Sequence, residues 1–149
     1  MMKDQIWILK IWFFWNYNKA QIKLNYGNST ILKKQERDER KMKEREIVDN
    51  IFYVGADDKD IRLFEGQYHV PNGMSYNSYI IKDNKNVILD TIDQRVTGEW
   101  LKNVEDVLEN EEADYLVISH LEPDHAYNID TLIKKYPNMK LIGNSITFN

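Results

Sequence analysis

The stretch from residue 120 to residue 125 is the part of this sequence best suited to chemistry, because two imidazoles and two carboxylates fall within six positions. These side chains are His120, Glu122, Asp124 and His125. Imidazole nitrogens and carboxylate oxygens are common ligands of transition metals. An apolar run, residues 115–118, precedes them directly and is expected to form a buried strand. A strand that ends in such a cluster brings several ligands to one point, so the sequence predicts a metal site there.

The spacing of these side chains allows two metal ions. A loop at a strand end is not confined to one face, so the first, third, fifth and sixth positions of the stretch can all point inward. We expect His120 and Glu122 to serve one metal. Asp124 and His125 would then serve the other. Pro123 should stiffen the loop between the two pairs and lower the entropy lost when the ligands become ordered.

The chain around this stretch has the patterning of a sheet covered by helices. Alternating and β-branched apolar residues predict strands, whereas apolar residues three or four positions apart predict helices. The expected strands cover residues 51–54, 75–82, 87–91, 114–119 and 140–143, and the expected helices begin at the caps Thr97 and Asn128. The resulting order, β-β-β-α-β-α-β, indicates an α/β fold with α+β character, because strands and helices do not alternate evenly. A lone histidine outside the stretch, His69, is expected at the surface.

The composition excludes several kinds of site and partner. The 149 residues contain no cysteine, which rules out disulfides, thiolate zinc sites and cysteine nucleophiles. Residues 42–149 hold eleven Lys/Arg against twenty Asp/Glu, and this acidic balance argues against nucleic acid as a partner. No glycine-rich phosphate loop is present. The absence of cysteine suits a reducing cytoplasm, where we expect the protein to reside.

The first forty-one residues differ from the rest. They hold nine Lys/Arg against four Asp/Glu, and residues 6–15 contain three of the four tryptophans. That apolar stretch is too short for a transmembrane helix, which needs about 20 residues, and an interfacial anchor is the less favoured alternative. We interpret residues 1–41 as a disordered or spurious extension ahead of a start at Met42. Residues 42–149 then form the domain.

The metal-binding stretch resembles that of the metallo-β-lactamase superfamily, whose hydrolases usually carry His-x-His-x-Asp-His and bind zinc. Glu122 stands here in place of the second histidine. A carboxylate is a harder, anionic ligand and favours iron over zinc. His-x-Glu-x-Asp-His is the version found in flavodiiron proteins, and the resemblance is nearest to the clostridial type. It extends over residues 63–66, 70–73, 75–79, 87–91 and 114–120, so that it covers the chain from about residue 47 to residue 149.

The resemblance implies the amino-terminal portion of a metallo-β-lactamase-like αββα sandwich. Flavodiiron proteins reduce oxygen to water or nitric oxide to nitrous oxide at two non-haem irons, with FMN in a separate flavodoxin-like domain. They take electrons from a rubredoxin-like or flavin donor and pair head to tail as homodimers. By this resemblance, Asp90 accepts hydrogen bonds that hold the ligand loop. The iron ligands in this sequence would be His120, Glu122, Asp124 and His125.

The same resemblance indicates that the site is incomplete. The family's remaining ligands and its FMN domain would follow Asn149, so we expect the 149-residue chain to be inactive by itself. Two alternatives stay open: part of a zinc-dependent hydrolase, against which Glu122 argues, and a metal-free structural remnant. The sequence also departs from the family pattern at Glu65, where some members have a histidine, and at Ala126-Tyr127, where two small residues are frequent.

Overall fold

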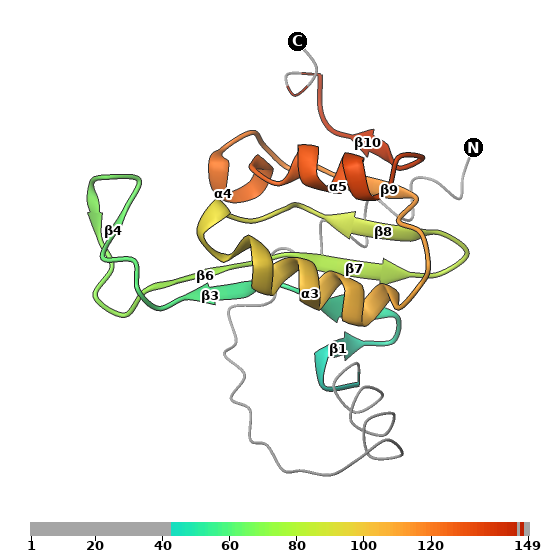
Figure 1. Cartoon of the computed structure of the whole chain (residues 1–149), viewed down its shortest axis with the longest axis horizontal. Coiled ribbons are helices and arrows are strands. Elements are labelled where there is room, and N and C mark those ends of the chain that lie inside the picture. The colour runs from blue at the N-terminus through green and yellow to red at the C-terminus, as the bar shows by residue number, and fades with distance from the viewer. Residues whose placement is uncertain (1–42, 146, 148–149) are drawn as a thin grey trace. The chain divides into compact units, whose positions relative to one another are not determined.

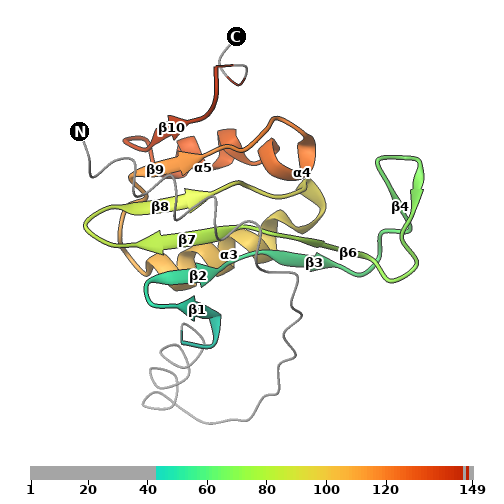
Figure 2. The ribbon, with the colours of Figure 1, turned by 180° about the vertical axis from the view of Figure 1, so that it is seen from behind.

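The computed structural model describes residues 43–145 and residue 147. The predictions for residues 1–41 and for a start at Met42 lie outside these described residues. The described part contains a six-stranded sheet with the two longer helices on one of its faces (Figures 1 and 2). None of its helices is long and apolar enough to cross a membrane.

The large sheet combines an antiparallel half with a parallel half. Its order is β1-β2-β7-β8-β9-β10. The strands are β1 (Glu46–Val48), β2 (Ile51–Tyr53), β7 (Tyr79–Lys82), β8 (Asn86–Leu89), β9 (Tyr115–Val117) and β10 (Lys140–Ile142). The strands from β1 to β8 pair antiparallel, whereas β8, β9 and β10 pair parallel. Parallel neighbours need crossover connections, and these contain α3 (Thr97–Leu108) and α5 (Ile129–Lys135).

Several short elements were not expected from the sequence. Two small antiparallel sheets form from β3 (Ala56–Asp58) with β6 (Met74–Tyr76), and from β4 (Leu63–Phe64) with β5 (Tyr68–His69). A 3₁₀ turn, η1 (Gln94–Val96), precedes α3, and a one-turn helix, α4 (Pro123–Ala126), precedes α5. Of these strands, β6 overlaps the strand predicted over residues 75–82, whereas β3, β4 and β5 have only two or three residues, which is too short for periodicity to predict them. His69 is exposed, as expected.

The core lies between the sheet and the two helices. Strand register places Phe52, Ile80, Ile88 and Leu116 side by side on one face, and all four are buried. The expected apolar face of α3 packs in the same cluster through Trp100, Val104, Val107 and Leu108. Burying one such side chain contributes roughly 1.5–3 kcal/mol.

The opposite face of the sheet is apolar as well. Register aligns Tyr53, Tyr79, Leu89 and Val117 across four neighbouring strands, and each of them is half-buried. A sheet with apolar side chains on both faces has near-continuous apolar strands instead of alternating ones. The runs 79–81 and 87–89 have this character.

The strand predicted over residues 75–82 is divided in the structure. Its first half, β6, pairs with β3, and its second half, β7, pairs with β2 and β8. Ser78 lies at the break, where its carbonyl accepts the N–H of Val54 at 2.9 Å. Its buried hydroxyl donates to the carbonyl of Asp90 at 3.0 Å. The interruption therefore ties the strand to the residue that follows β8.

Of the two predicted helix caps, Asn128 occupies the predicted position and Thr97 lies one residue inside its helix. Val96 is the N-cap of α3, so Thr97 is the first helical residue, and its hydroxyl contacts the Gln94 carbonyl and Oδ1 of Asn128. Asn128 does occupy the N-cap position of α5, but its side chain makes no capping bond. Its amide donates to the carbonyl of Ile92 at 2.7 Å. Both side chains connect the segment after β8 to α5, and they are therefore not available to cap the helices.

An ion pair joins β3 to η1 and should make folding sensitive to acid. Buried Asp58 pairs with Arg95, and this hydrogen bond holds the pKa of the carboxyl below its ordinary value, although burial acts in the opposite direction. A folded-state pKa below the unfolded one gives stability above the unfolded value that is lost as pH falls through the folded value. We predict that Arg95→Gln moves the midpoint of acid unfolding to higher pH, as measured by circular dichroism. Lys102→Gln, which breaks the exposed pair with Asp106, should leave the midpoint in place.

Candidate metal centre

The parallel strands β8 and β9 end at the same edge of the sheet. Their register sets Leu89 opposite Val117, and the N–H of Asp90 donates to the Val117 carbonyl at 2.8 Å. His120 follows β9 at this edge. Ligand sites of open α/β sheets lie outside the carboxyl ends of the strands. The fold therefore brings Asp90 next to the stretch that contains the predicted ligands, although thirty positions of sequence separate them.

Part of this stretch is helical instead of forming a loop. Pro123 is the first residue of α4, a position that suits its fixed φ and its missing N–H. The carbonyl of Glu122 accepts the N–H groups of His125 and Ala126 at 2.9 and 3.0 Å. Pro123 thus starts a turn of helix, and this turn sets the direction of Asp124 and His125.

Both ring nitrogens of His125 lie near a carboxylate. Its Nδ1 lies 3.1 Å from Oδ2 of Asp90, and its Nε2 lies 3.5 Å from Oδ2 of Asp124. A carboxylate at Nδ1 keeps the proton of the neutral ring there and leaves the lone pair of Nε2 for a metal. Burial by itself lowers the pKa of His125, but the hydrogen bond and charge of Asp90, with the charge of Asp124, raise this pKa overall.

His120 has a similar arrangement in a more exposed place. Its Nδ1 lies 3.0 Å from Oγ of Ser119, and its Nε2 lies 3.2 Å from Oε2 of Glu122. The centroids of the His120 and His125 rings are 4.0 Å apart. The four predicted ligands therefore form two neighbouring histidine–carboxylate pairs, each with an Nε2 atom toward a carboxylate oxygen.

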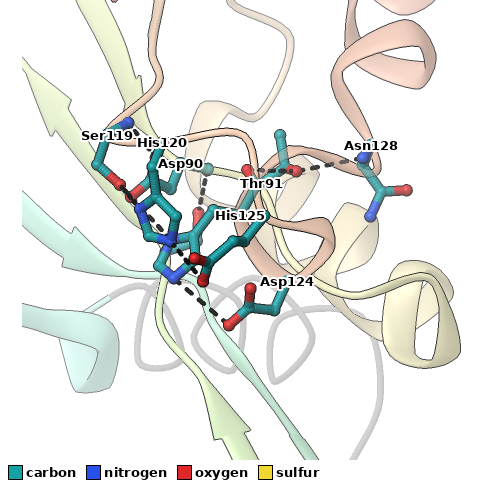
Figure 3. A network of polar contacts seen from close by, with 9 residues as sticks. Asp90, Thr91, Ser119, His120, Asp124, His125 and Asn128 are labelled. Carbon is teal, nitrogen blue, oxygen red and sulfur yellow. Dashed lines mark hydrogen bonds and ion pairs between the residues drawn. The ribbon is translucent and has the colours of Figure 1, made fainter. Parts of the chain in front are cut away.

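Asp90 lies beside this group and contacts His125 and Ser119, the residue that precedes His120 (Figure 3). Its Oδ1 accepts the N–H of Ser119, its Oδ2 accepts the Ser119 hydroxyl, both at 2.7 Å, and the same Oδ2 faces His125. Its φ of 55° is in the left-handed region, which aspartate tolerates better than most residues. Two features therefore restrict the residue type at position 90: the left-handed backbone and the hydrogen bonds of the side chain.

Three residues of this network were not identified from the sequence: Thr91, Ser119 and Asn128. The N–H and the hydroxyl of Thr91 both donate to the carbonyl of His125 at 2.8 Å, and the N–H of Asn128 donates to Oγ1 of Thr91 at 3.2 Å (Figure 3). Thr91 and Ser119 are sequence neighbours of Asp90 and His120, which the sequence did identify. Their position as polar residues at the end of a buried strand was the signal that could have found them.

The donor set fits a transition metal. Ligand atoms of His120, Asp124 and His125 lie within 4.8 Å of one another. Oδ1 of Asp124 is buried and has no hydrogen-bond partner among the described residues, and a buried carboxylate without full pairing favours a nearby cation. Glu122 is not in the 4.8 Å group, and its side chain is 64% exposed. Of His120, Asp124 and His125, only His120 is in contact with a carboxylate oxygen of Glu122.

Comparison with known proteins also indicates a metal-binding protein. No family model matches the chain. The flavo-diiron protein FprA2 of Clostridium acetobutylicum is 37% identical over 99 residues, which are 66% of this chain and 25% of that protein. The chain is a relative of the flavodiiron proteins. An anaerobic nitric oxide reductase flavorubredoxin of Enterobacter sp. (strain 638) is 38% identical over 93 residues, 62% of this chain and 19% of that protein.

Solved structures of flavodiiron proteins share the fold. Rubredoxin oxygen:oxidoreductase from Desulfovibrio gigas superposes with a TM-score of 0.64 at 37% identity, over 68% of this chain and 25% of that one. The flavodiiron protein from Giardia intestinalis gives a TM-score of 0.60 at 31% identity, over 65% and 24%. The α/β, metallo-β-lactamase-like fold expected from the sequence is therefore confirmed. The chain spans a quarter or less of the curated flavodiiron relatives described above.

Proposed function

We propose that this chain supplies ligands to a non-haem diiron centre that reduces oxygen to water or nitric oxide to nitrous oxide. The observation that carries the proposal is the pair of neighbouring histidine–carboxylate groups at the end of β9. Similarity to flavodiiron proteins supports iron as the metal. When bound, two ferrous ions would supply the electrons for the reduction.

Each ligand residue has a defined part in this proposal. His120 and His125 would donate through Nε2, since Nδ1 of each already has a partner. Glu122 and Asp124 would add anionic oxygens, which stabilise ferric charge. Asp90 would keep the Nδ1 proton of His125 and hold the backbone of Ser119. The chain would thus fix ligand geometry and protonation, and the metals would carry the redox change.

The rest of the proposal concerns the whole protein. FMN, a rubredoxin-like or flavin electron donor, a head-to-tail homodimer and a cytoplasmic location are proposed from the family resemblance. The name of one relative, rubredoxin oxygen:oxidoreductase, supports a donor of this kind. We also retain residues 42–149 as the proposed domain and residues 1–41 as a proposed extension.

A metal competition experiment tests the choice of iron. Glu122→His restores the zinc-type pattern and should raise zinc uptake relative to iron by at least about tenfold, roughly 1.4 kcal/mol. The 149-residue chain would be equilibrated without oxygen in equal ferrous iron and zinc, and its metal content measured by mass spectrometry. Glu99→His, at an exposed position of α3, is the control and should not change the ratio.

The outcomes of this competition separate the candidate functions. A wild-type chain that takes up neither metal would overturn the proposed metal centre and favour the metal-free remnant. Equal metal ratios for wild type and Glu122→His would show that this carboxylate does not set the metal. In that event the zinc-dependent hydrolase becomes the better assignment.

A further inference from the structure

The hydroxyl of Thr91 bridges two backbone groups where α4 gives way to α5. It donates to the carbonyl of His125 at 2.8 Å, and its Oγ1 accepts the N–H of Asn128 at 3.2 Å. A continuous 3₁₀ turn would join this carbonyl and this N–H directly, because the two residues are three positions apart. A side chain inserted into a helical hydrogen-bond ladder bends or interrupts the helix. The Thr91 hydroxyl therefore accounts for the interruption between α4 and α5.

The two side chains at this bridge are fixed in the interior. Thr91 and Asn128 are fully buried. The side-chain amide of Asn128 donates to the carbonyl of Ile92 at 2.7 Å, and its Oδ1 accepts the hydroxyl of Thr97 at 2.9 Å. Asn128 is thereby held against the segment that follows β8. Because its N–H donates to Oγ1 of Thr91, the single proton of the Thr91 hydroxyl is left for the carbonyl of His125.

Consecutive residues hold His125 by its ring and by its backbone. Asp90 lies 3.1 Å from the ring nitrogen Nδ1, whereas the N–H and the hydroxyl of Thr91 each reach the carbonyl at 2.8 Å (Figure 3). We propose that Thr91 is a positioning residue of the metal centre: its hydroxyl interrupts the helix after α4 and so sets the direction in which Asp124 and His125 present their ligand atoms. The proposal rests on the metal centre proposed above. It extends that centre to a residue that supplies no ligand atom.

Three variants separate the bridge from burial and general stability. Thr91→Val has nearly the same shape and keeps the backbone bond to His125, but it leaves no atom to join that carbonyl to the N–H of Asn128. Thr91→Ser keeps the hydroxyl and loses only the methyl group. Asn103→Ala is the control for loss of buried hydrogen bonds, because the amide of this buried residue of α3 donates to the carbonyls at positions 54 and 55, outside the ligand stretch.

Cobalt(II) titration of the 149-residue chain tests this role. Cobalt absorption bands report the geometry of the ligands, and the melting temperature of the metal-free protein reports folding. Groups that orient metal ligands typically change metal affinity by about 10- to 100-fold when they are removed, so we expect Thr91→Val to lower cobalt affinity by about tenfold and to shift the bands. Thr91→Ser should restore both to the wild-type values. Asn103→Ala should lower the melting temperature and keep wild-type affinity and bands.

Each other outcome has a definite meaning. Wild-type affinity and bands in Thr91→Val, or no recovery in Thr91→Ser, would overturn the role of the hydroxyl while the metal centre stands. Equal losses of cobalt affinity in Thr91→Val and Asn103→Ala would also overturn it, as would a Thr91→Val chain that does not fold, because the hydroxyl would then serve the fold in general. Failure of the wild-type chain itself to bind cobalt would overturn the metal centre and this role together.

Discussion

Replacing His120 or His125 by alanine should lower the affinity of the chain for ferrous iron by at least about 100-fold. Residues that merely support metal ligands contribute about 10- to 100-fold, so loss of a ligand nitrogen should exceed that range. His125 has the additional contact with Asp90, and its removal leaves that buried carboxylate with one partner fewer. His120 is more exposed, so its variant should fold like the wild type. Anaerobic iron titration followed by calorimetry measures both affinities.

His69→Ala provides the control for this experiment. His69 lies in β5, is exposed, and is the third histidine of the chain. Its removal should leave iron affinity unchanged within twofold error of about 0.4 kcal/mol. Equal affinities for wild type and His120→Ala would remove His120 from the ligand set and contradict the two-pair arrangement.

Asp90→Asn should lower metal affinity by about 10- to 100-fold while the chain stays folded. Asparagine tolerates the left-handed backbone of this position, and its amide oxygen still accepts the N–H of Ser119. Its amide nitrogen, however, would donate toward Nδ1 of His125. The neutral ring would then carry its proton on Nε2, the nitrogen that a metal requires. A change of one atom would thus block the ligand by changing its tautomer.

Two measurements make this expectation specific. Nitrogen-15 spectra of the metal-free variant should show the Nε2–H tautomer of His125, whereas the wild type should show Nδ1–H at a pH where the ring is neutral. Asp83→Asn, in the turn between β7 and β8, is the control for loss of one carboxylate and should alter neither readout. An unchanged tautomer together with wild-type affinity would contradict the role assigned to Asp90.

The sequence predicted the elements that repeat a strong pattern. The apolar face of α3 through Trp100, Val104 and Leu108 is buried as expected, and the hairpin between β7 and β8 forms at residues 83–85. The predicted ligands meet at one edge because two parallel strands end there, and a buried strand followed by polar residues is visible in sequence. Long apolar runs therefore gave both the sheet and the location of the candidate site.

Features that depend on contacts across the fold were missed or misplaced. Thr97 and Asn128 resemble helix caps locally, but in the structure they contact each other, and this distant contact outweighs local capping preference. The break at Ser78 depends on its contact with Asp90, twelve positions later.

The apolar side chains on the second face of the large sheet have a consequence for mutagenesis. Tyr53, Tyr79, Leu89 and Val117 are turned away from α3 and α5, yet they are half-buried. This second face is therefore only partly shielded from water, in contrast to the buried face that packs against the helices. Charged substitutions on that side should cost less stability than those in the core but more than those at exposed positions, so solubilising changes belong on the outward surfaces of the helices.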